Sequence, residues 1–205
     1  MKHKESFTWL FIAFLGLVSH LLKAQNTISQ DADEKSVLIV YLSRTGNTKA
    51  VAEIIQKQVG GDLVVLELET PYPEEYDAIV KQVAEENETG FLPPLRTKID
   101  VENYDIIFLG FPTWGMQLPP PMKSFLTEND LSDKTVVPFN TNAGYGVGSS
   151  FATVKELSSG ANILDGFSIQ GGIERDGILL VMEGEKAEDA EKKVTEWLQE
   201  IEMIE

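Results

Sequence analysis

The stretch Ser43-Arg44-Thr45-Gly46-Asn47-Thr48 directly follows the apolar run VLIVYL at residues 37–42. The run has the length and the β-branched content of a strand that is buried on both faces, as in a parallel sheet. After the stretch, apolar residues recur at helical spacing from Ala50 to Val59 and stop at Gly60-Gly61. The stretch therefore lies where a strand passes into the N-terminus of a helix.

Such a junction favours an anion site. The first backbone N–H groups of a helix have no partner within the helix and lie at the positive end of its dipole, so they bind a phosphate without a Lys or Arg side chain. Hydroxyl and amide side chains of residues 43–48 add donors, and Gly46 permits a positive φ. The alternative interpretation is an ordinary polar loop with a capping Thr or Asn.

Two further loops follow apolar strands. The run at residues 106–111 passes into a loop at 112–118 that contains Trp114, which either folds into the core or forms a stacking platform. The run at 136–139 contains Pro138, which cannot donate to a ladder and indicates a bulge or an irregular neighbour. This run passes into a loop at residues 140–150 that is rich in Gly and small polar residues. The simplest interpretation of this pattern is a mobile loop before a capped helix.

The remaining patterns alternate strand and helix. Strands are predicted at residues 62–68 and 163–169, and helices from Tyr76 to about residues 87–90, around residues 120–126, at 151–157 and at 187–201. The apolar run at 178–182 either extends the last strand or forms a small hairpin. This order predicts a doubly wound parallel sheet with helices on both faces, whose ligands lie beyond the carboxyl ends of the strands.

Several kinds of chemistry are excluded by composition. The chain has no Cys, and both of its His residues, His3 and His20, lie in the first 24 residues. Cys or Ser nucleophiles activated by His, zinc sites with N and S ligands, haem ligation by His and disulfides are therefore not expected beyond that segment. Carboxylate chemistry, an oxygen-ligated metal, an organic cofactor or no chemistry remain. No catalytic residue or metal ligand is assigned.

Residues 1–24 have the layout of a secretory signal peptide, with Lys2, His3 and Lys4 before an apolar stretch at residues 7–22. Because Leu22 is not the small residue preferred before a cleavage site, an uncleaved anchor is the alternative. The absence of an Arg pair in the leader indicates threading as an unfolded chain. Residues 25–36 are polar and are predicted to be a flexible tether, and residues 37–205 form one domain.

The chain is acidic. Of its 17 basic and 33 acidic residues, three and one lie in the leader, so removal of residues 1–24 leaves 14 and 32 and a formal charge of −18. This charge repels nucleic acid and favours basic protein partners, although solubility alone also explains a charge of this sign. No stable membrane insertion is expected after cleavage.

Together the three loops resemble those of the flavodoxin family. The family's phosphate loop is a Thr/Ser-x-Thr-Gly-Asn-Thr turn after the first strand, and residues 43–48 match it. The resemblance extends over roughly residues 37–201 and implies a flavodoxin-like α/β fold, a doubly wound five-stranded parallel sheet of order 2-1-3-4-5, and non-covalently bound FMN. The cofactor-binding residues that it implies are Ser43, Arg44, Thr45, Gly46, Asn47, Thr48, Pro112, Thr113, Trp114, Gly115, Thr141, Asn142, Gly144, Tyr145 and Gly146.

The resemblance implies one-electron transfer through FMN, with basic redox proteins as partners, in an exported short form of the family that is expected to be a monomer. Two alternatives stay open: an FMN-dependent NAD(P)H (quinone) reductase, and a binding module of the same fold that has lost flavin. Two features depart from the family. Tyr145 lies among glycines rather than in an acidic loop, and a leader is unusual for a family that works in the cytoplasm.

Overall fold

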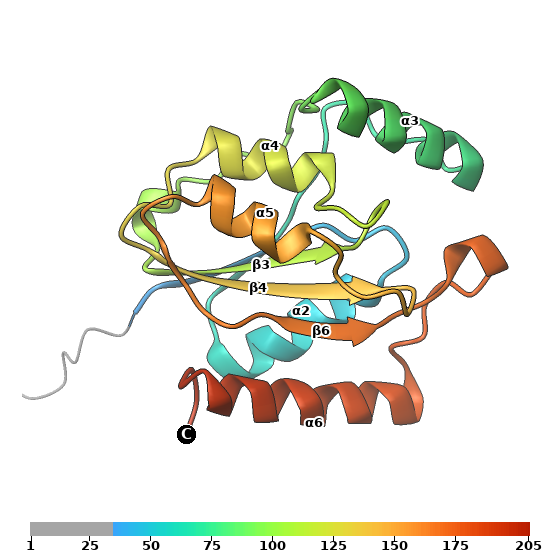
Figure 1. Ribbon diagram of the computed structural model, residues 1–205. Coiled ribbons are helices and arrows are strands. Elements are labelled where there is room, and N and C mark those ends of the chain that lie inside the picture. The colour runs from blue at the N-terminus through green and yellow to red at the C-terminus, as the bar shows by residue number, and fades with distance from the viewer. Residues whose placement is uncertain (1–34) are drawn as a thin grey trace, which may run out of the picture. The chain divides into compact units, whose positions relative to one another are not determined.

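The computed structural model describes residues 35–205, which form one unit (Figure 1). The predicted leader at residues 1–24 and the predicted tether up to residue 34 lie outside the described residues. None of the helices within residues 35–205 has the length and apolar content needed to cross a membrane.

The centre of the fold is a parallel sheet. Its strands are β1 (Val37–Tyr41), β2 (Asp62–Val65), β3 (Ile106–Pro112), β4 (Thr135–Asn142), β5 (Asn162–Ile163) and β6 (Phe167–Gln170). The order is β2-β1-β3-β4-β5, and β6 also pairs with β4, so β5 and β6 share the last position. The predicted order 2-1-3-4-5 is confirmed, with the fifth strand divided in two.

Pro138 explains this division. Within β4, Val136 accepts a hydrogen bond from the backbone N–H of Leu164, and Asn142 accepts one from Gly171, so alternate residues of β4 face the last strand position. Pro138 lies on the same side and has no N–H to donate. The last position is interrupted beside it, between Ile163 and Phe167. The irregular neighbour predicted from Pro138 is therefore this gap between β5 and β6.

Helices cover both faces of the sheet, as the continuous apolar strands predict. The helices are α2 (Asn47–Val59), α3 (Tyr76–Thr89), α4 (Pro120–Glu128), α5 (Ser150–Leu157) and α6 (Gly184–Glu200). In Figure 1, α2 and α6 lie below the sheet and α4 and α5 lie above it. The buried core is divided accordingly: Leu109 and Phe125 belong to one cluster, and Ile55 and Leu198 belong to the other.

Strands β1 and β3 are buried almost throughout, which fits their position in the middle of the sheet. Gly110 in β3 has no room for a side chain, because a Cβ there would lie 2.1 Å from the ring of Phe139 on β4. The second predicted strand is shorter than expected and ends at Val65.

The segment between β6 and α6 contains no named strand. It holds a short 3-10 helix, η2 (Glu174–Asp176), and one antiparallel bridge between Ile173 and Ile178. The apolar run at 178–182 therefore does not extend the last strand, and its first residue pairs back across a small turn. A second 3-10 helix, η1 (Val101–Asn103), precedes β3.

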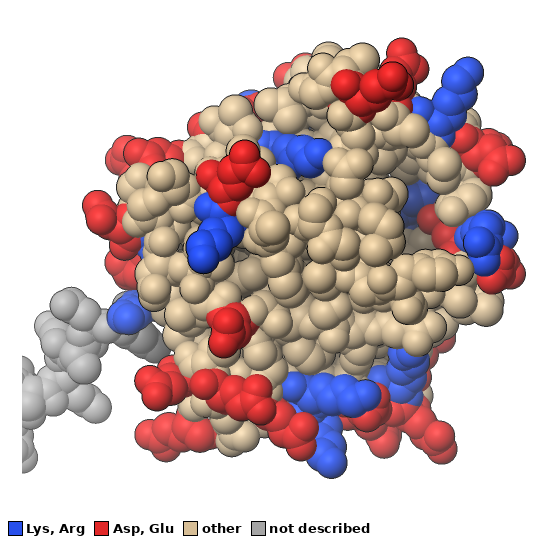
Figure 2. Space-filling view, in the orientation of Figure 1, with Lys and Arg blue, Asp and Glu red and all other residues tan. Residues whose placement is uncertain are grey.

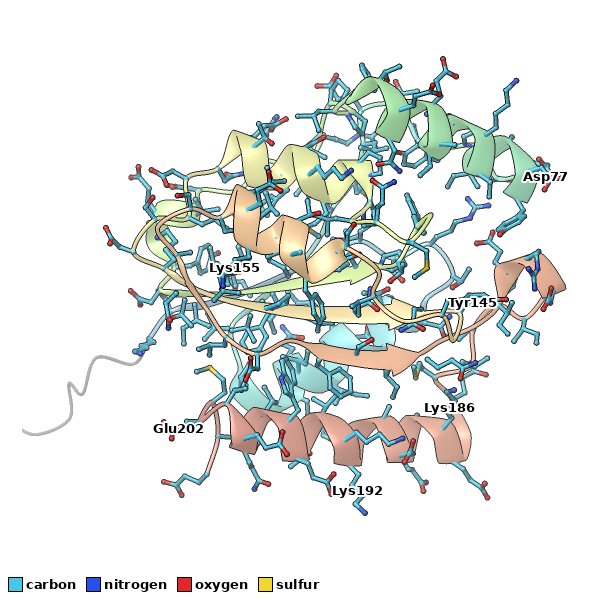
Figure 3. The ribbon with its side chains drawn as sticks, viewed as in Figure 1. Asp77, Tyr145, Lys155, Lys186, Lys192 and Glu202 are labelled. Atoms are coloured by element: carbon cyan, nitrogen blue, oxygen red, sulfur yellow. The ribbon has the colours of Figure 1, made fainter. Side chains whose placement is uncertain are left out.

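Charge is distributed unevenly over the surface. Figure 2 shows charged side chains gathered over α6, whereas the middle of the same face, over β4, β6 and the start of α5, is largely uncharged. Lys192 on α6 points away from the sheet (Figure 3). The charged residues of α6 thus form a solvated outer face, as expected for an amphipathic helix whose apolar stripe packs on a sheet.

Candidate functional site

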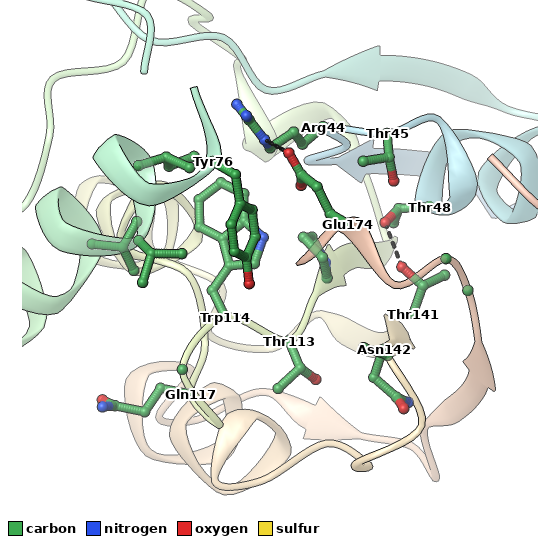
Figure 4. A pocket seen from close by; sticks show the side chains of 18 of the residues that line it. Arg44, Thr45, Thr48, Tyr76, Thr113, Trp114, Gln117, Thr141, Asn142 and Glu174 are labelled. Atoms are coloured by element: carbon green, nitrogen blue, oxygen red, sulfur yellow. Dashed lines mark hydrogen bonds and ion pairs between the residues drawn. The ribbon is translucent and has the colours of Figure 1, made fainter. Parts of the chain in front are cut away.

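A cavity of about 500 Å³ lies at the carboxyl ends of the central strands (Figure 4). This volume is within the usual range for cofactor sites. Residues from all three predicted loops line it: Arg44, Thr45, Asn47 and Thr48 after β1, Pro112, Thr113, Trp114 and Gly115 at the end of β3, and Thr141 and Asn142 at the end of β4. The structure therefore brings the three loops together in one cavity.

The phosphate loop, residues 43–48, has free backbone donors. Helix α2 begins at Asn47, and its N-cap residue Gly46 has a left-handed conformation with φ of 89°. Lys49 N–H donates to Ser43 Oγ at 3.2 Å, but within residues 35–205 the N–H groups of Gly46, Asn47 and Thr48 find no protein acceptor. No carboxylate of the described chain occupies them. They remain available to an anion in the cavity.

The side chain of Thr48 links the first and third loops. Its hydroxyl lies 2.8 Å from the hydroxyl of Thr141, and both residues are buried (Figure 4). The second and third loops are linked as well, since Thr113 N–H donates to Thr141 O at 2.9 Å and Asn140 Nδ2 donates to Thr113 Oγ1 at 3.0 Å. These bonds fix the three loops relative to one another before any ligand enters.

The guanidinium of Arg44 is engaged by other parts of the chain. Its Nε donates to Glu174 Oε1 at 2.7 Å, and its two Nη atoms donate to the backbone oxygens of Pro73 and Glu74 at 2.9 Å and 2.5 Å. The charged residues that line the cavity are Arg44, Glu88 and Glu174. A bound phosphate would thus meet mainly neutral donors.

Trp114 forms part of the cavity wall. Its backbone pairs with Gln117 in a tight turn, with N···O distances of 3.2 Å and 3.0 Å. Its ring packs edge-on against Tyr72, with ring centroids 5.5 Å apart. Trp114 contacts the core and also lines the cavity, and its role as a stacking platform stays a prediction. Gly115 beside it has φ of 57° and open space at its Cβ position.

Behind Trp114 lies a buried polar pair. Glu86 on α3 is 5% exposed and accepts a hydrogen bond from the Tyr72 hydroxyl. It also accepts one from Gln82 Nε2 at 2.9 Å. Burial, and then the hydrogen bond to Glu86, raise the pKa of Tyr72 far above its ordinary value of 10.0. Tyr72 therefore stays protonated and continues to donate to Glu86.

The third loop is shaped by Asn142. Its Oδ1 accepts from the N–H groups of Gly144 and Gly146 at 2.8 Å and 3.1 Å, and both glycines have positive φ. Tyr145 between them is 66% exposed and lines a second cavity of about 250 Å³, together with Gly146 and Arg175. The second cavity adjoins the first, because both are lined by Thr113, Gly115 and Asn142 among others.

Some predicted site residues do not line the main cavity. Ser43 Oγ accepts from the N–H of Lys49, Gly46 is the N-cap residue of α2, and Gly144 packs near the side chain of Gln170. Tyr145 and Gly146 line only the second cavity. These positions shape the loops or border the neighbouring cavity, and their contact with a cofactor stays a prediction.

Sequence reasoning missed two parts of the wall. Helix α3 contributes Tyr76, Ile79, Val80 and Val83, and the segment after β6 contributes Gly171, Gly172 and Glu174. The spacing of the α3 residues predicted an apolar helix face but not that the face borders a cavity. For Glu174 no local pattern gives a signal, since its partner Arg44 is 130 residues away.

The residues present fit FMN. Free N–H groups at a helix N-terminus suit a phosphate, and a wall of Trp114, Tyr76 and aliphatic α3 side chains suits a planar ring system. Within residues 35–205, no group of His, Cys, Asp and Glu side chains is placed to hold a metal ion.

Comparison with known proteins gives consistent results. A family model described as Flavodoxin matches residues 36–184. A putative flavoprotein from Bacteroides eggerthii is similar in structure, with a TM-score of 0.65 and 26% identity over 82% of this chain and 98% of that one. A flavoprotein from Lactobacillus acidophilus solved in complex with FMN has a TM-score of 0.57 and 24% identity over 66% of this chain and 93% of that one. No curated protein matches the chain.

Proposed function

Because the chain belongs to the flavodoxin family, we propose that it is an electron carrier that works through bound FMN. FMN is the cofactor that the family and the site favour. One observation supports the proposal above all: the free N–H groups at the start of α2 and the ring of Trp114 face one cavity. A ligand with a phosphate at one end and a flat ring at the other fits both features.

FMN supplies the one-electron redox chemistry when bound, and the protein supplies binding and electrostatics. The N–H groups of Gly46, Asn47 and Thr48 would hold the phosphate, and Thr45 adds a hydroxyl. Trp114 and the backbone of residues 112–115 and 141–143 would flank the ring. Gly115, with positive φ and open space beside it, leaves its peptide free to reorient toward the ring.

The charge of the protein supports electron transfer to basic partners. A formal charge of −18 for residues 25–205 attracts a basic protein over long range and raises the rate of encounter at low salt. The same negative field disfavours added negative charge on the ring system, which lowers the potential of the second reduction. Export through the leader at residues 1–24 is part of this proposal and is supported by the leader's sequence alone.

The alternative, an FMN-dependent NAD(P)H reductase, has one observation in its favour. The second cavity, of about 250 Å³, adjoins the main one, and Arg175 on its wall offers a cation to a second ligand. The second cavity is nevertheless small, and the guanidinium of Arg175 is paired with Asp176 at 2.9 Å. The carrier therefore remains the better supported function.

The test is titration of the chain lacking residues 1–24 with FMN, followed by two assays. We expect a bound-flavin visible spectrum, transfer of single electrons to a basic acceptor protein such as cytochrome c, and a rate of transfer that falls as salt increases. Absence of FMN binding would support the module that has lost flavin. Sustained NADH or NADPH oxidation by the loaded protein would support the reductase.

A further inference from the structure

Trp114 in the cavity wall contacts a tyrosine–carboxylate pair that the proposed function does not use. The ring of Trp114 lies edge-on against the ring of Tyr72, with the ring centroids 5.5 Å apart. The Tyr72 hydroxyl in turn donates to Oε2 of Glu86 on α3. An indole, a phenol and a carboxylate therefore follow one another from the cavity wall into the protein.

The carboxylate of Glu86 is a fixed proton acceptor for Tyr72. Glu86 is 5% exposed, and its second oxygen accepts from Gln82 Nε2 at 2.9 Å. None of the ion pairs formed by residues 35–205 includes Glu86, so neutral donors stabilise this carboxylate. A buried carboxylate without a cation is costly, and a proton that neutralises it is therefore favourable.

The phenol of Tyr72 keeps its proton in the resting protein. Burial, and then the hydrogen bond to Glu86, raise the pKa of Tyr72 far above 10.0. Loss of an electron reverses this preference, because an oxidised phenol is a strong acid. The hydrogen bond to Glu86 already connects the phenol to the group that would take the proton.

We propose that Trp114, Tyr72 and Glu86 form a relay that moves an oxidising equivalent from the cavity into the protein. A one-electron oxidant at the cavity takes an electron from the indole of Trp114. Tyr72 replaces that electron and passes its hydroxyl proton to Oε2 of Glu86. The products are neutral Trp114, a neutral tyrosyl radical and protonated Glu86, so the positive charge that oxidation creates cancels the buried carboxylate. One electron from a reductant such as ascorbate, and return of the proton, restore Tyr72.

The relay protects the cavity wall. An indole radical is open to covalent oxidation, and its rapid reduction by Tyr72 spares Trp114 from that damage. Under the proposed function the oxidant is bound flavin excited by light, and the inference rests on that function only for the source of the oxidant. The three groups of the relay all belong to the chain itself.

The experiment is laser-flash oxidation of the whole chain, without FMN, by a ruthenium(III) polypyridyl complex in solution. Transient absorption follows the tryptophanyl radical, and the part of the signal that Trp114→Phe abolishes belongs to Trp114. The test variants are Tyr72→Phe and Glu86→Gln. The matched controls are Tyr104→Phe and Asp62→Asn. The Tyr104 hydroxyl also donates to a carboxylate, Asp62 Oδ2 at 2.7 Å, but Tyr104 belongs to none of the aromatic pairs of residues 35–205.

We expect the Trp114 radical of the unaltered chain to decay as a tyrosyl radical appears. The decay should be slower in heavy water than in ordinary water, because a proton moves with the electron. Tyr72→Phe and Glu86→Gln should each lengthen the lifetime of the Trp114 radical by about 100-fold, since each removes a partner of the positioned proton transfer. Both controls should leave the lifetime unchanged.

Three results would each overturn the proposal: an unchanged lifetime in Tyr72→Phe, a Glu86→Gln variant that behaves as Asp62→Asn does, or equal decay in heavy and ordinary water. The solvent comparison uses the unaltered chain, so it decides the question even if a test variant does not fold. Failure of the chain to bind FMN in a separate titration would refute the proposed function and leave the relay standing.

Discussion

Asn47→Ala tests whether the phosphate loop and the strap, which is the segment at residues 171–183 between β6 and α6, form one structural unit. The side chain of Asn47 is almost fully buried and makes three hydrogen bonds, to Thr45 Oγ1 at 2.9 Å and to the backbone of Leu179 and Val181. A hydrogen bond contributes about 0.5–1.5 kcal/mol net, so three bonds amount to about 3 kcal/mol. Because the strap groups that lose their partner are only partly buried and can reach water, we expect a loss of about 2 kcal/mol in the free energy of unfolding.

The assay is thermal and urea unfolding of the protein without FMN, so that cofactor binding does not enter. For a chain of this size the expected loss lowers the melting temperature by about 4–8 °C. Asn103→Ala is the control, because this exposed amide makes one long bond, 3.5 Å, to Asp100 O, and it should change stability by less than about 0.5 kcal/mol. Amide hydrogen exchange at Val181 should become faster in Asn47→Ala alone. Equal melting temperatures for both variants and the parent, with Val181 still protected, would refute the reasoning.

Three further changes probe the core, the acid limb of stability and the support of the cavity wall. Gly110→Ala places a methyl group 2.1 Å from the buried ring of Phe139, so it should cost about 3 kcal/mol or more in urea unfolding, and a loss below about 0.5 kcal/mol would contradict the packing described. The pKa of Asp105 lies below its ordinary value of 3.8 because the backbone N–H and then the hydroxyl of Ser36 donate to it. The ionised Asp105 therefore stabilises the fold above pH 3.8, and this stabilisation is lost as the pH falls through the lowered pKa. The difference in melting temperature between the parent and Asp105→Asn should accordingly disappear in acid. A difference that does not change with pH would count against this contact. Tyr72→Phe removes one donor from the buried carboxylate that it contacts and should cost about 1–3 kcal/mol in unfolding, while unchanged stability and unchanged Trp fluorescence would show that the pair does not support Trp114.

The phosphate loop could be predicted because its signal is local. An apolar strand, a short polar turn with Gly46 and a helical pattern are contiguous, and the geometry of a strand–helix junction determines where the N–H groups point. The alternating strand and helix patterns predicted a parallel sheet covered on both faces, and the family resemblance implied the order of its strands. Pro138 gave a correct local signal as well, although only the pairing of β4 shows that its effect falls on the division between β5 and β6.

The rest of the site depends on contacts between distant parts of the chain. The pattern of α3 correctly predicted a helix, but periodicity does not distinguish a helix face that borders a cavity from one that packs on the sheet. The apolar run at residues 178–182 predicts a strand or a hairpin, yet Ile178, Leu179 and Leu180 are 46%, 51% and 42% exposed on the strap. The sequence predicts that Asn47 binds the cofactor; in the structure its side chain bonds to the backbone of Leu179 and Val181, and its contact with a cofactor stays a prediction.

The use of Arg44 connects these findings. A free guanidinium in the phosphate loop would attract any polyphosphate, because its interaction with phosphate depends on charge more than on the length of the ligand. Here the guanidinium instead joins the phosphate loop to Glu174 and to the segment before α3. The donors left free at the start of α2 are neutral backbone N–H groups, which under the proposed function would hold the phosphate of FMN. Arg44 and Asn47 thus use their side chains to hold the strap against the start of α2, and the backbone N–H groups there are left without a protein partner among residues 35–205.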